Sequence, residues 1–120
     1  MKRALAIALA LLACLTACSF ENKNEREADK MTHAVMNNDL GPVRDDIAPT
    51  VQISRVQVAR WADELSTQGK LVSIKEVTEG CKPEWHCFDV KFEKATYHES
   101  LRYDEKGKVA DWDFHLAPST

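Results

Sequence analysis

Glycine and proline are scarce in this 120-residue chain, at four each, and only 8% of the residues are aromatic. The sequence contains no glycine-rich phosphate-binding loop, no serine nucleophile elbow and no zinc-protease helix motif. Basic residues are the minority, with 16 lysines and arginines against 19 aspartates and glutamates. Because nucleic acids and anionic lipid surfaces attract concentrated positive charge, this balance argues against both as ligands. The missing motifs favour a non-catalytic protein with no cofactor and no metal.

The N-terminal apolar run is too short to cross a membrane as a helix. Lys2 and Arg3 precede nine apolar residues, 4–12, whereas a spanning helix needs about 20. A short apolar run after basic residues is typical of a secretory signal peptide. We therefore expect residues 1–17 to be removed on export. The mature chain would keep 14 basic and 19 acidic side chains, giving a formal charge of −5.

The end of this segment, Leu15-Thr16-Ala17-Cys18, resembles the bacterial lipobox, in which a peptidase cuts before a cysteine that receives diacylglycerol. A second box ending at Cys14 is an alternative, but it would leave a very short apolar run. The resemblance implies acylation of Cys18 by palmitate-type chains, and each buried methylene stabilises membrane binding by about 0.8 kcal/mol. Ser19 resembles the outer-membrane sorting pattern. The implied location is the cell envelope, on the outer membrane facing the periplasm.

Two cysteines lie beyond the predicted signal peptide, Cys81 and Cys87. The periplasm is oxidising, so a disulfide between them is the default interpretation. Closing the loop 81–87 should stabilise the fold by about 2 kcal/mol through chain entropy. The alternative is a metal site completed by His86 and a distant histidine. Zinc sites usually have shorter cysteine spacings and a second ligand pair, which makes this alternative the weaker one.

Helical periodicity dominates the first half of the mature chain. Asn24 and Glu27 form a capping pair for a first helix that should run to about Asn38. A short second helix should follow. The third helix is the clearest, because Ser54 and Gln57 form a capping box. Its apolar stripe consists of Val58, Trp61, Ala62 and Leu65, and its stop signal is Gly69.

After Gly69 the hydrophobic period changes to two, which is typical of strands with one buried face. Four antiparallel strands are expected, at residues 71–77, 88–92, 96–103 and 108–116. The last strand should point Ala110, Trp112, Phe114 and Leu116 inward. Helices that precede strands in this way favour an α+β fold, with N-terminal helices packed on a curved four-stranded antiparallel sheet.

Three turn segments resemble the nuclear-transport-factor-like superfamily, also called the cystatin-like cone fold. They are Asn38-Asp39-Leu40, Gly69-Lys70-Leu71-Val72-Ser73-Ile74 and Tyr103-Asp104-Glu105-Lys106-Gly107-Lys108-Val109. The resemblance implies a small exported domain over residues 27–117, behind a lipidated tether at 18–26. This superfamily contains enzymes, binding proteins and inhibitors, and its open sheet faces commonly pair into homodimers, so the resemblance implies a fold and no single activity.

Glu99 is the candidate for chemistry inside the cone. A four-residue hairpin loop would pair Tyr103 with Lys108 and therefore Glu99 with Trp112. Glu99 would then face inward, where its charged form is disfavoured and where it could act as an acid, a base or a ligand-binding carboxylate. That would suit a small-molecule-binding protein or an isomerase or hydrolase. Alternatively, Glu99 lies at the margin of the sheet, solvated or paired with a lysine.

The opposite face of the last strand carries Asp111, Asp113 and His115, and the same register places His98 opposite Asp113. An aspartate can orient a histidine as a general base, but Ser100 is the only nucleophile expected nearby. A polar row is also what alternation predicts for a solvated sheet face with no function. We take these residues as a candidate protein-contact surface.

Trp85 and His86 lie inside the loop between the two cysteines. No apolar stripe accounts for Trp85, and a rigid aromatic on a disulfide-closed loop is typical of an interface anchor. Alternatively, it folds back over the end of the sheet. Together these features favour a non-catalytic envelope lipoprotein that binds another protein, for example as an inhibitor or immunity protein of a secreted toxin. An enzyme using the interior of the cone is the alternative.

Overall fold

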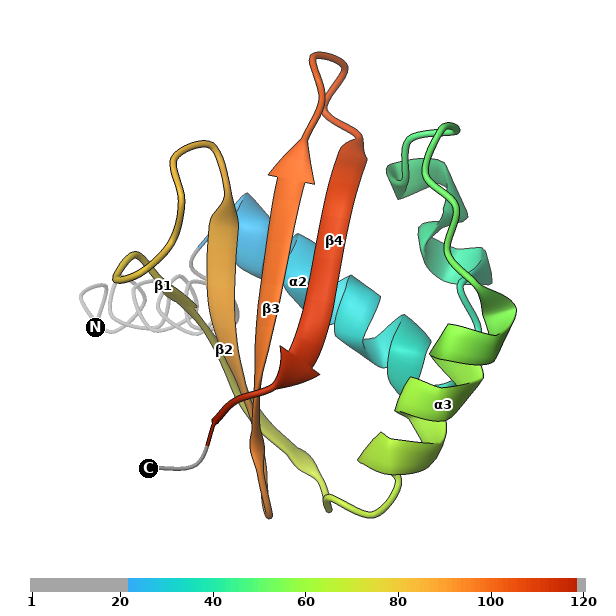
Figure 1. Ribbon diagram of the computed structural model, residues 1–120, viewed down its shortest axis with the longest axis vertical. Coiled ribbons are helices and arrows are strands. Elements are labelled where there is room, and N and C mark those ends of the chain that lie inside the picture. The colour runs from blue at the N-terminus through green and yellow to red at the C-terminus, as the bar shows by residue number, and fades with distance from the viewer. Residues whose placement is uncertain (1–21, 119–120) are drawn as a thin grey trace, which may run out of the picture.

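The computed structural model describes residues 22–118, and within them the fold is α+β. Its elements in chain order are helix α2 (Lys23–Met36), the 3-10 helix η1 (Gly41–Asp46), helix α3 (Arg55–Leu65) and strands β1 (Leu71–Val77), β2 (His86–Phe92), β3 (Thr96–Tyr103) and β4 (Val109–Leu116). The strands form one antiparallel sheet in sequential order, and these helices lie on one side of it (Figure 1). The predicted signal peptide, Cys14 and Cys18 lie outside the described residues. None of the described helices has the length and hydropathy needed to cross a membrane.

Helix α2 begins two residues earlier than its capping pattern predicted. Asn22, not Asn24, is the N-cap, and its side chain accepts a hydrogen bond from the Glu25 backbone N–H at 2.8 Å. The sequence repeats the same spacing of asparagine and glutamate at both positions. Glu25 favours Asn22 over Asn24 as the N-cap, because its carboxylate also accepts the backbone N–H of Glu76 on β1 at 3.1 Å. The expected tether at 18–26 was therefore too long at its C-terminal end, since residues 23–26 are helical.

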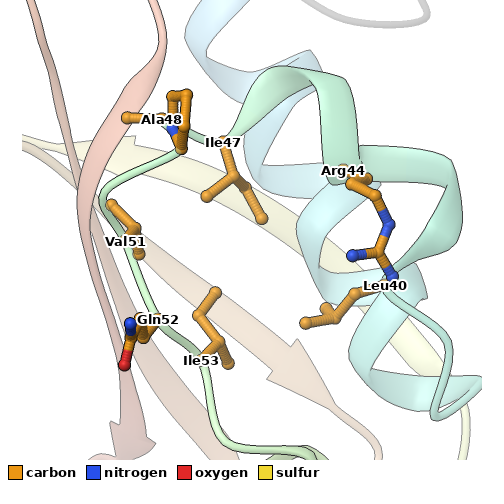
Figure 2. Close-up of a pocket in the computed structure, with 8 residues that line it drawn as sticks. Leu40, Arg44, Ile47, Ala48, Val51, Gln52 and Ile53 are labelled. Carbon is orange, nitrogen blue, oxygen red and sulfur yellow. The ribbon is translucent and has the colours of Figure 1, made fainter.

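The second helix is a 3-10 helix with Pro42 in its first turn. It ends before Ile47, which turns into extended backbone and bridges Val109 of β4 in parallel. Ala48 then donates its backbone N–H to the Val109 carbonyl at 2.9 Å. The following link, residues 49–54, has no regular structure and borders a groove beside η1 (Figure 2).

Helix α3 begins as predicted. Ser54 caps it by accepting the Gln57 backbone N–H at 3.3 Å, and Ser66 is the C-cap. Gly69 lies beyond the last turn with φ of +83°, in the left-handed region that favours glycine. A side chain there would also clash with Glu93, which accepts the Lys70 N–H at 2.8 Å. Gly69 therefore makes the turn from helix into sheet.

The hairpin between β3 and β4 corrects the expected register. Tyr103 pairs with Val109 instead of Lys108, and Glu99 pairs with Phe114 instead of Trp112. Two changes combine here: the hairpin loop covers residues 104–108, one residue more than expected, and a β-bulge next to Arg102 leaves Ala110 as an extra residue on β4. Val109 takes the inward position that was expected of Ala110 and is 1% exposed.

The core lies between α2 and the inner face of the sheet. Its members include Met31 and Val35 from α2 and the inward residues Phe88, Val90, Tyr97, Leu101 and Phe114. Trp61 and Trp112 pack against this core as predicted, with ring centroids 5.1 Å apart. Leu116, the last residue of β4, does not belong to it, because its side chain is 53% exposed.

Candidate functional site

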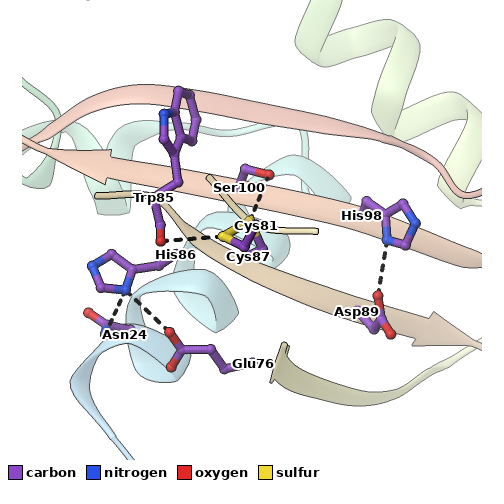
Figure 3. Close-up of a disulfide and its surroundings, with 9 residues drawn as sticks. All are labelled: Asn24, Glu76, Cys81, Trp85, His86, Cys87, Asp89, His98 and Ser100. Carbon is purple, nitrogen blue, oxygen red and sulfur yellow. Dashed lines mark hydrogen bonds and ion pairs between the residues drawn. A yellow bond between two sulfur atoms is a disulfide. The ribbon is translucent and has the colours of Figure 1, made fainter. Parts of the chain in front are cut away.

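The sheet face turned away from the described helices carries what we call the outer-face patch: Trp85, Cys87, Asp89, His98, Ser100, Asp113 and His115 (Figure 3). Two hollows of about 320 and about 520 Å³ lie on this patch. Both are lined by Gly80, Cys87 and Ser100, so they are neighbours. The first reaches Trp85 and the second reaches both histidines. Three of the predicted protein-contact residues of β3 and β4, His98, Asp113 and His115, therefore share one surface with the disulfide loop, whereas Asp111 lines neither hollow.

Cys81 and Cys87 lie at disulfide-bonding distance, with their Cα atoms 5.8 Å apart, as expected for the predicted pair. Among residues 22–118, these cysteines do not form the metal-binding group that was the alternative. The loop holds Trp85 through a turn in which its backbone N–H donates to the Lys82 carbonyl at 3.1 Å. Glu84 completes this turn at φ of +73°, an uncommon conformation outside glycine. Trp85 is partly buried and lines the first hollow together with Ser100 and Asp113.

Replacing both cysteines, as Cys81→Ser with Cys87→Ser, should lower the free energy of unfolding by about 2 kcal/mol, because the closed loop is short. Urea unfolding followed by tryptophan fluorescence measures the change. Wild type kept in reductant is the matched control and should unfold at the same urea concentration as the double variant. An unchanged midpoint in both samples would show that the bond does not restrict the unfolded chain as this account requires.

Two histidines of the patch are each held by an aspartate. His98 Nδ1 lies 3.0 Å from Asp89 Oδ1, and His115 Nδ1 lies 2.6 Å from Asp113 Oδ2. The two imidazole rings meet edge to face, 5.6 Å apart. The expected pairing of His98 with Asp113 was wrong, because the longer hairpin loop and the bulge together shift β4 by two residues and place His115 opposite His98. Each contact occupies Nδ1 and leaves Nε2 to face solvent or a partner.

The remaining polar residues of this face have contacts of their own. Asp111 pairs with Arg102, whose Nε donates to its Oδ2 at 2.5 Å. Ser100 directs its hydroxyl to the sulfur of Cys87 at 3.8 Å. A nucleophilic serine would instead give its hydroxyl hydrogen bond to a general base. The arrangement therefore favours a protein-binding surface over a catalytic site.

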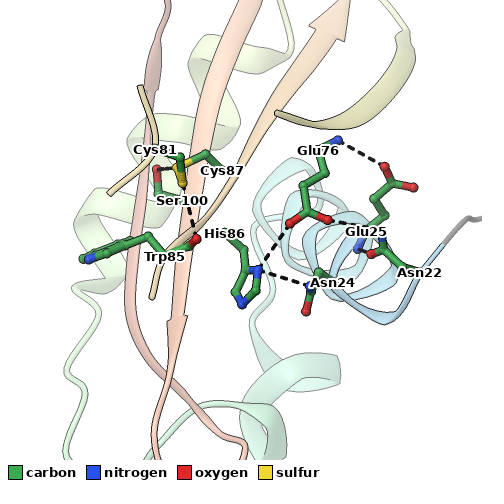
Figure 4. Close-up of polar contacts among 9 residues, drawn as sticks. All are labelled: Asn22, Asn24, Glu25, Glu76, Cys81, Trp85, His86, Cys87 and Ser100. Carbon is green, nitrogen blue, oxygen red and sulfur yellow. Dashed lines mark hydrogen bonds and ion pairs between the residues drawn. A yellow bond between two sulfur atoms is a disulfide. The ribbon is translucent and has the colours of Figure 1, made fainter. Parts of the chain in front are cut away.

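His86 lies on the inner face of the sheet, apart from the outer-face patch (Figure 4). Its Nδ1 is 3.2 Å from Glu76 Oε2 and 3.1 Å from Asn24 Nδ2. Its ring lies 5.5 Å from that of Tyr103. The structure thus separates His86 from Trp85 and gives it contacts that join β1 and β2 to the first turn of α2.

Glu99 faces inward, as predicted, and is 0% exposed. Thr32 donates its hydroxyl to Oε1 at 2.9 Å, and Trp112 donates Nε1–H to Oε2 at 2.8 Å. The alternative of a solvated Glu99 at the sheet margin was wrong. Burial raises the pKa of this carboxyl to about 8, and the two donors offset the rise only in part. Because both oxygens are already hydrogen-bonded, Glu99 is better suited to joining α2 to β4 than to binding a ligand.

Glu27 on α2 is a second carboxyl with a raised pKa, and it was not predicted as a site residue. Burial, followed by a hydrogen bond with Asp46, raises the pKa of Glu27 to about 7. Asp46 also binds Lys30, whose Nζ lies 2.6 Å from Oδ2. The spacing of Glu27 and Lys30 places both on one helix face, which is the signal that sequence reasoning could have used. The three side chains connect α2 to η1.

Comparisons of the chain with protein-family models, with curated proteins and with solved structures found no match. The geometry of the outer-face patch is therefore the basis for inferring what this domain binds.

Proposed function

We propose that this chain is a lipid-anchored envelope protein whose domain binds another protein through the outer-face patch, as an inhibitor or immunity protein of a secreted toxin would. The observation that supports this best is the combination of a sheet face that no described helix covers with a partly exposed tryptophan on a disulfide-closed loop. Rigid aromatics beside hollows are common anchors of protein interfaces, because they bury a large apolar area with little loss of side-chain freedom.

Charge indicates what kind of partner fits. The mature chain would carry a formal charge of −5, and the larger hollow is lined by Glu79 and Asp89 together with the two histidines. The partner should therefore present a basic surface around an apolar contact for Trp85. Charge complementarity of this kind raises the association rate more than the final affinity, so binding should weaken with added salt.

The proposed anchor is supported by the lipobox-like sequence that ends at Cys18. The N-cap Asn22 follows it by four residues, which reach at most about 14 Å. A lipid on Cys18 would therefore hold the domain close to the bilayer. The succession of helices and a sequentially ordered antiparallel sheet supports the resemblance to the cone superfamily in the same way.

Labelling growing cells with an alkyne fatty acid tests the anchor. We expect label on wild type and on Cys14→Ser, and loss of label with retention of the precursor in Cys18→Ser. Labelled Cys18→Ser together with unlabelled Cys14→Ser would place the modification at the other cysteine. No label on any form would remove the anchor from the proposal.

Site-specific photo-crosslinking tests the binding surface in the full-length, membrane-bound protein. A photoreactive residue at position 100 should form a salt-sensitive crosslink to a basic protein, whereas one at position 60, on the exposed face of α3, should not. Trp85→Ala should reduce the crosslink, and the captured protein should be toxic when produced in the periplasm without this chain. A crosslink to a second copy of the chain, or equal behaviour of wild type and Trp85→Ala, would contradict the proposal.

A further inference from the structure

A groove separate from the outer-face patch runs between η1 and the link to α3 (Figure 2). It consists of two neighbouring hollows, of about 360 and about 550 Å³. Leu40, Arg44 and Ile53 line both of them. Hollows of this size are in the range of small-molecule sites, which hold roughly 300 to 1,000 Å³.

Apolar side chains form about half of the first hollow and a smaller part of the second, which is mainly polar. Ile47 and Val51 line the first hollow, Val58 lines the second, and Leu40 and Ile53 contribute to both. Figure 2 shows the side chains of Leu40, Ile47 and Ile53 directed into the space between η1 and the link. The link is fixed at its start by the bond of Ala48 to Val109 and by a turn in which Val51 donates to the Ala48 carbonyl at 3.0 Å. The apolar walls therefore belong to a backbone that is already held in place.

Two arginine side chains also line the groove. Arg44 lines both hollows and Arg55 lines the second. Neither has a side-chain hydrogen bond or an ion pair among residues 22–118. Asp39 also lines the second hollow, and its Oδ1 accepts a hydrogen bond from the Gly41 backbone N–H at 2.9 Å. The groove thus combines apolar walls with two cations available to an external anion.

We propose that this groove binds a single-chain anionic amphiphile, with its alkyl body against Leu40, Ile47 and Ile53 and its head group on Arg44 and Arg55. Arginine suits such a head group because its planar fork of N–H donors matches a carboxylate or a phosphate. A neutral chain would leave the guanidinium groups unpaired, and a small anion would leave the apolar walls empty. Both halves of the ligand are therefore needed for tight binding.

Amide NMR of the full chain with octanoate, octyl phosphate, octanol and acetate tests this proposal. We expect saturable shifts at residues 40–58 with octanoate and octyl phosphate, and dissociation constants at least tenfold higher for octanol and acetate. The tighter of the two anions identifies the head group as a carboxylate or a phosphate.

Variants separate the groove from general surface binding. Arg44→Gln should raise the dissociation constant for the better anion at least tenfold, whereas Arg60→Gln, an exposed residue of α3 outside the groove, should leave it unchanged. Retained spectral dispersion in both variants shows that they are folded. Equal binding of octanoate and octanol, wild-type affinity in Arg44→Gln, or the absence of saturable shifts at residues 40–58 would overturn the proposal.

Discussion

Glu99→Gln should unfold at a higher temperature than wild type at pH 8, and the difference should disappear below about pH 4.5. The pKa of the buried Glu99 carboxyl is raised from 4.5 to about 8, so the folded protein keeps a proton that the unfolded chain releases. Between these two values the folded state binds more protons, and the stability of wild type falls as the pH rises. Glutamine has no proton to lose. Its amide can donate to Thr32 while its oxygen accepts from Trp112, so the contacts are kept.

The size of the effect follows from the pKa difference. Each unit corresponds to about 1.4 kcal/mol, so the gain at pH 8 is on the order of 4 kcal/mol, or roughly 20 °C for a domain of this size. Thermal unfolding followed by circular dichroism from pH 4 to pH 9 measures it. Part of the pH dependence should remain in the variant, because burial also raises the pKa of Glu27.

The matched control is Glu105→Gln in the exposed β3–β4 hairpin. It should follow the wild-type profile at every pH. If the stability of Glu99→Gln relative to wild type did not rise between pH 4.5 and pH 8, the raised pKa of Glu99 would be wrong. A loss of stability of the same size at every pH, added to that rise, would show that glutamine reproduces the contacts of the carboxyl only in part.

Leu101→Ala should lower the free energy of unfolding by about 3 to 5 kcal/mol, the range for deleting a buried leucine side chain. Leu101 is 0% exposed and belongs to the core between β3 and α2. Truncating it removes apolar contacts and leaves a cavity that packed neighbours can fill only in part. Urea unfolding at pH 6, where the Glu99 carboxyl keeps its proton, measures the change.

Leu116→Ala supplies the comparison for the same substitution on the neighbouring strand. Its side chain is 53% exposed, so the cost should stay below about 1 kcal/mol. Alternation along β4 predicts that Leu116 is as buried as Leu101, whereas the structure leaves Leu116 exposed. Equal losses of stability would therefore contradict the exposed position of Leu116 at the end of β4.

Much of the sheet could be predicted because its signal is local. β-Branched content and a turn signal gave the bounds of β1, alternation gave those of β3, and the capping box gave the start of α3. The pairing between strands could not be obtained in this way. A hairpin loop one residue longer than expected and the bulged residue Ala110 leave the pattern of each strand intact and still change every partner between β3 and β4.

The same distinction holds for the candidate site. The disulfide and the inward position of Glu99 follow from spacing and alternation within short segments. The partner of His98 is Asp89 on β2, and the partner of Glu99 is Thr32 on α2, far away in the sequence. Thr32 carries one signal, because it lies on the inward face of an amphipathic helix. No comparable signal relates Asp89 to His98.

The first turn of α2 also affects how the domain resists a pulling force applied at its N-terminal end. Whatever pulls on the chain before Asn22 acts on a helix end that is joined to the sheet, through Glu25 and the Glu76 backbone and through Asn24 and His86. These bonds would have to break together before the helix could unravel turn by turn. Tension on the N-terminus should therefore pass to β1 and β2, which the disulfide holds at one end, and the domain should resist being drawn out from this side.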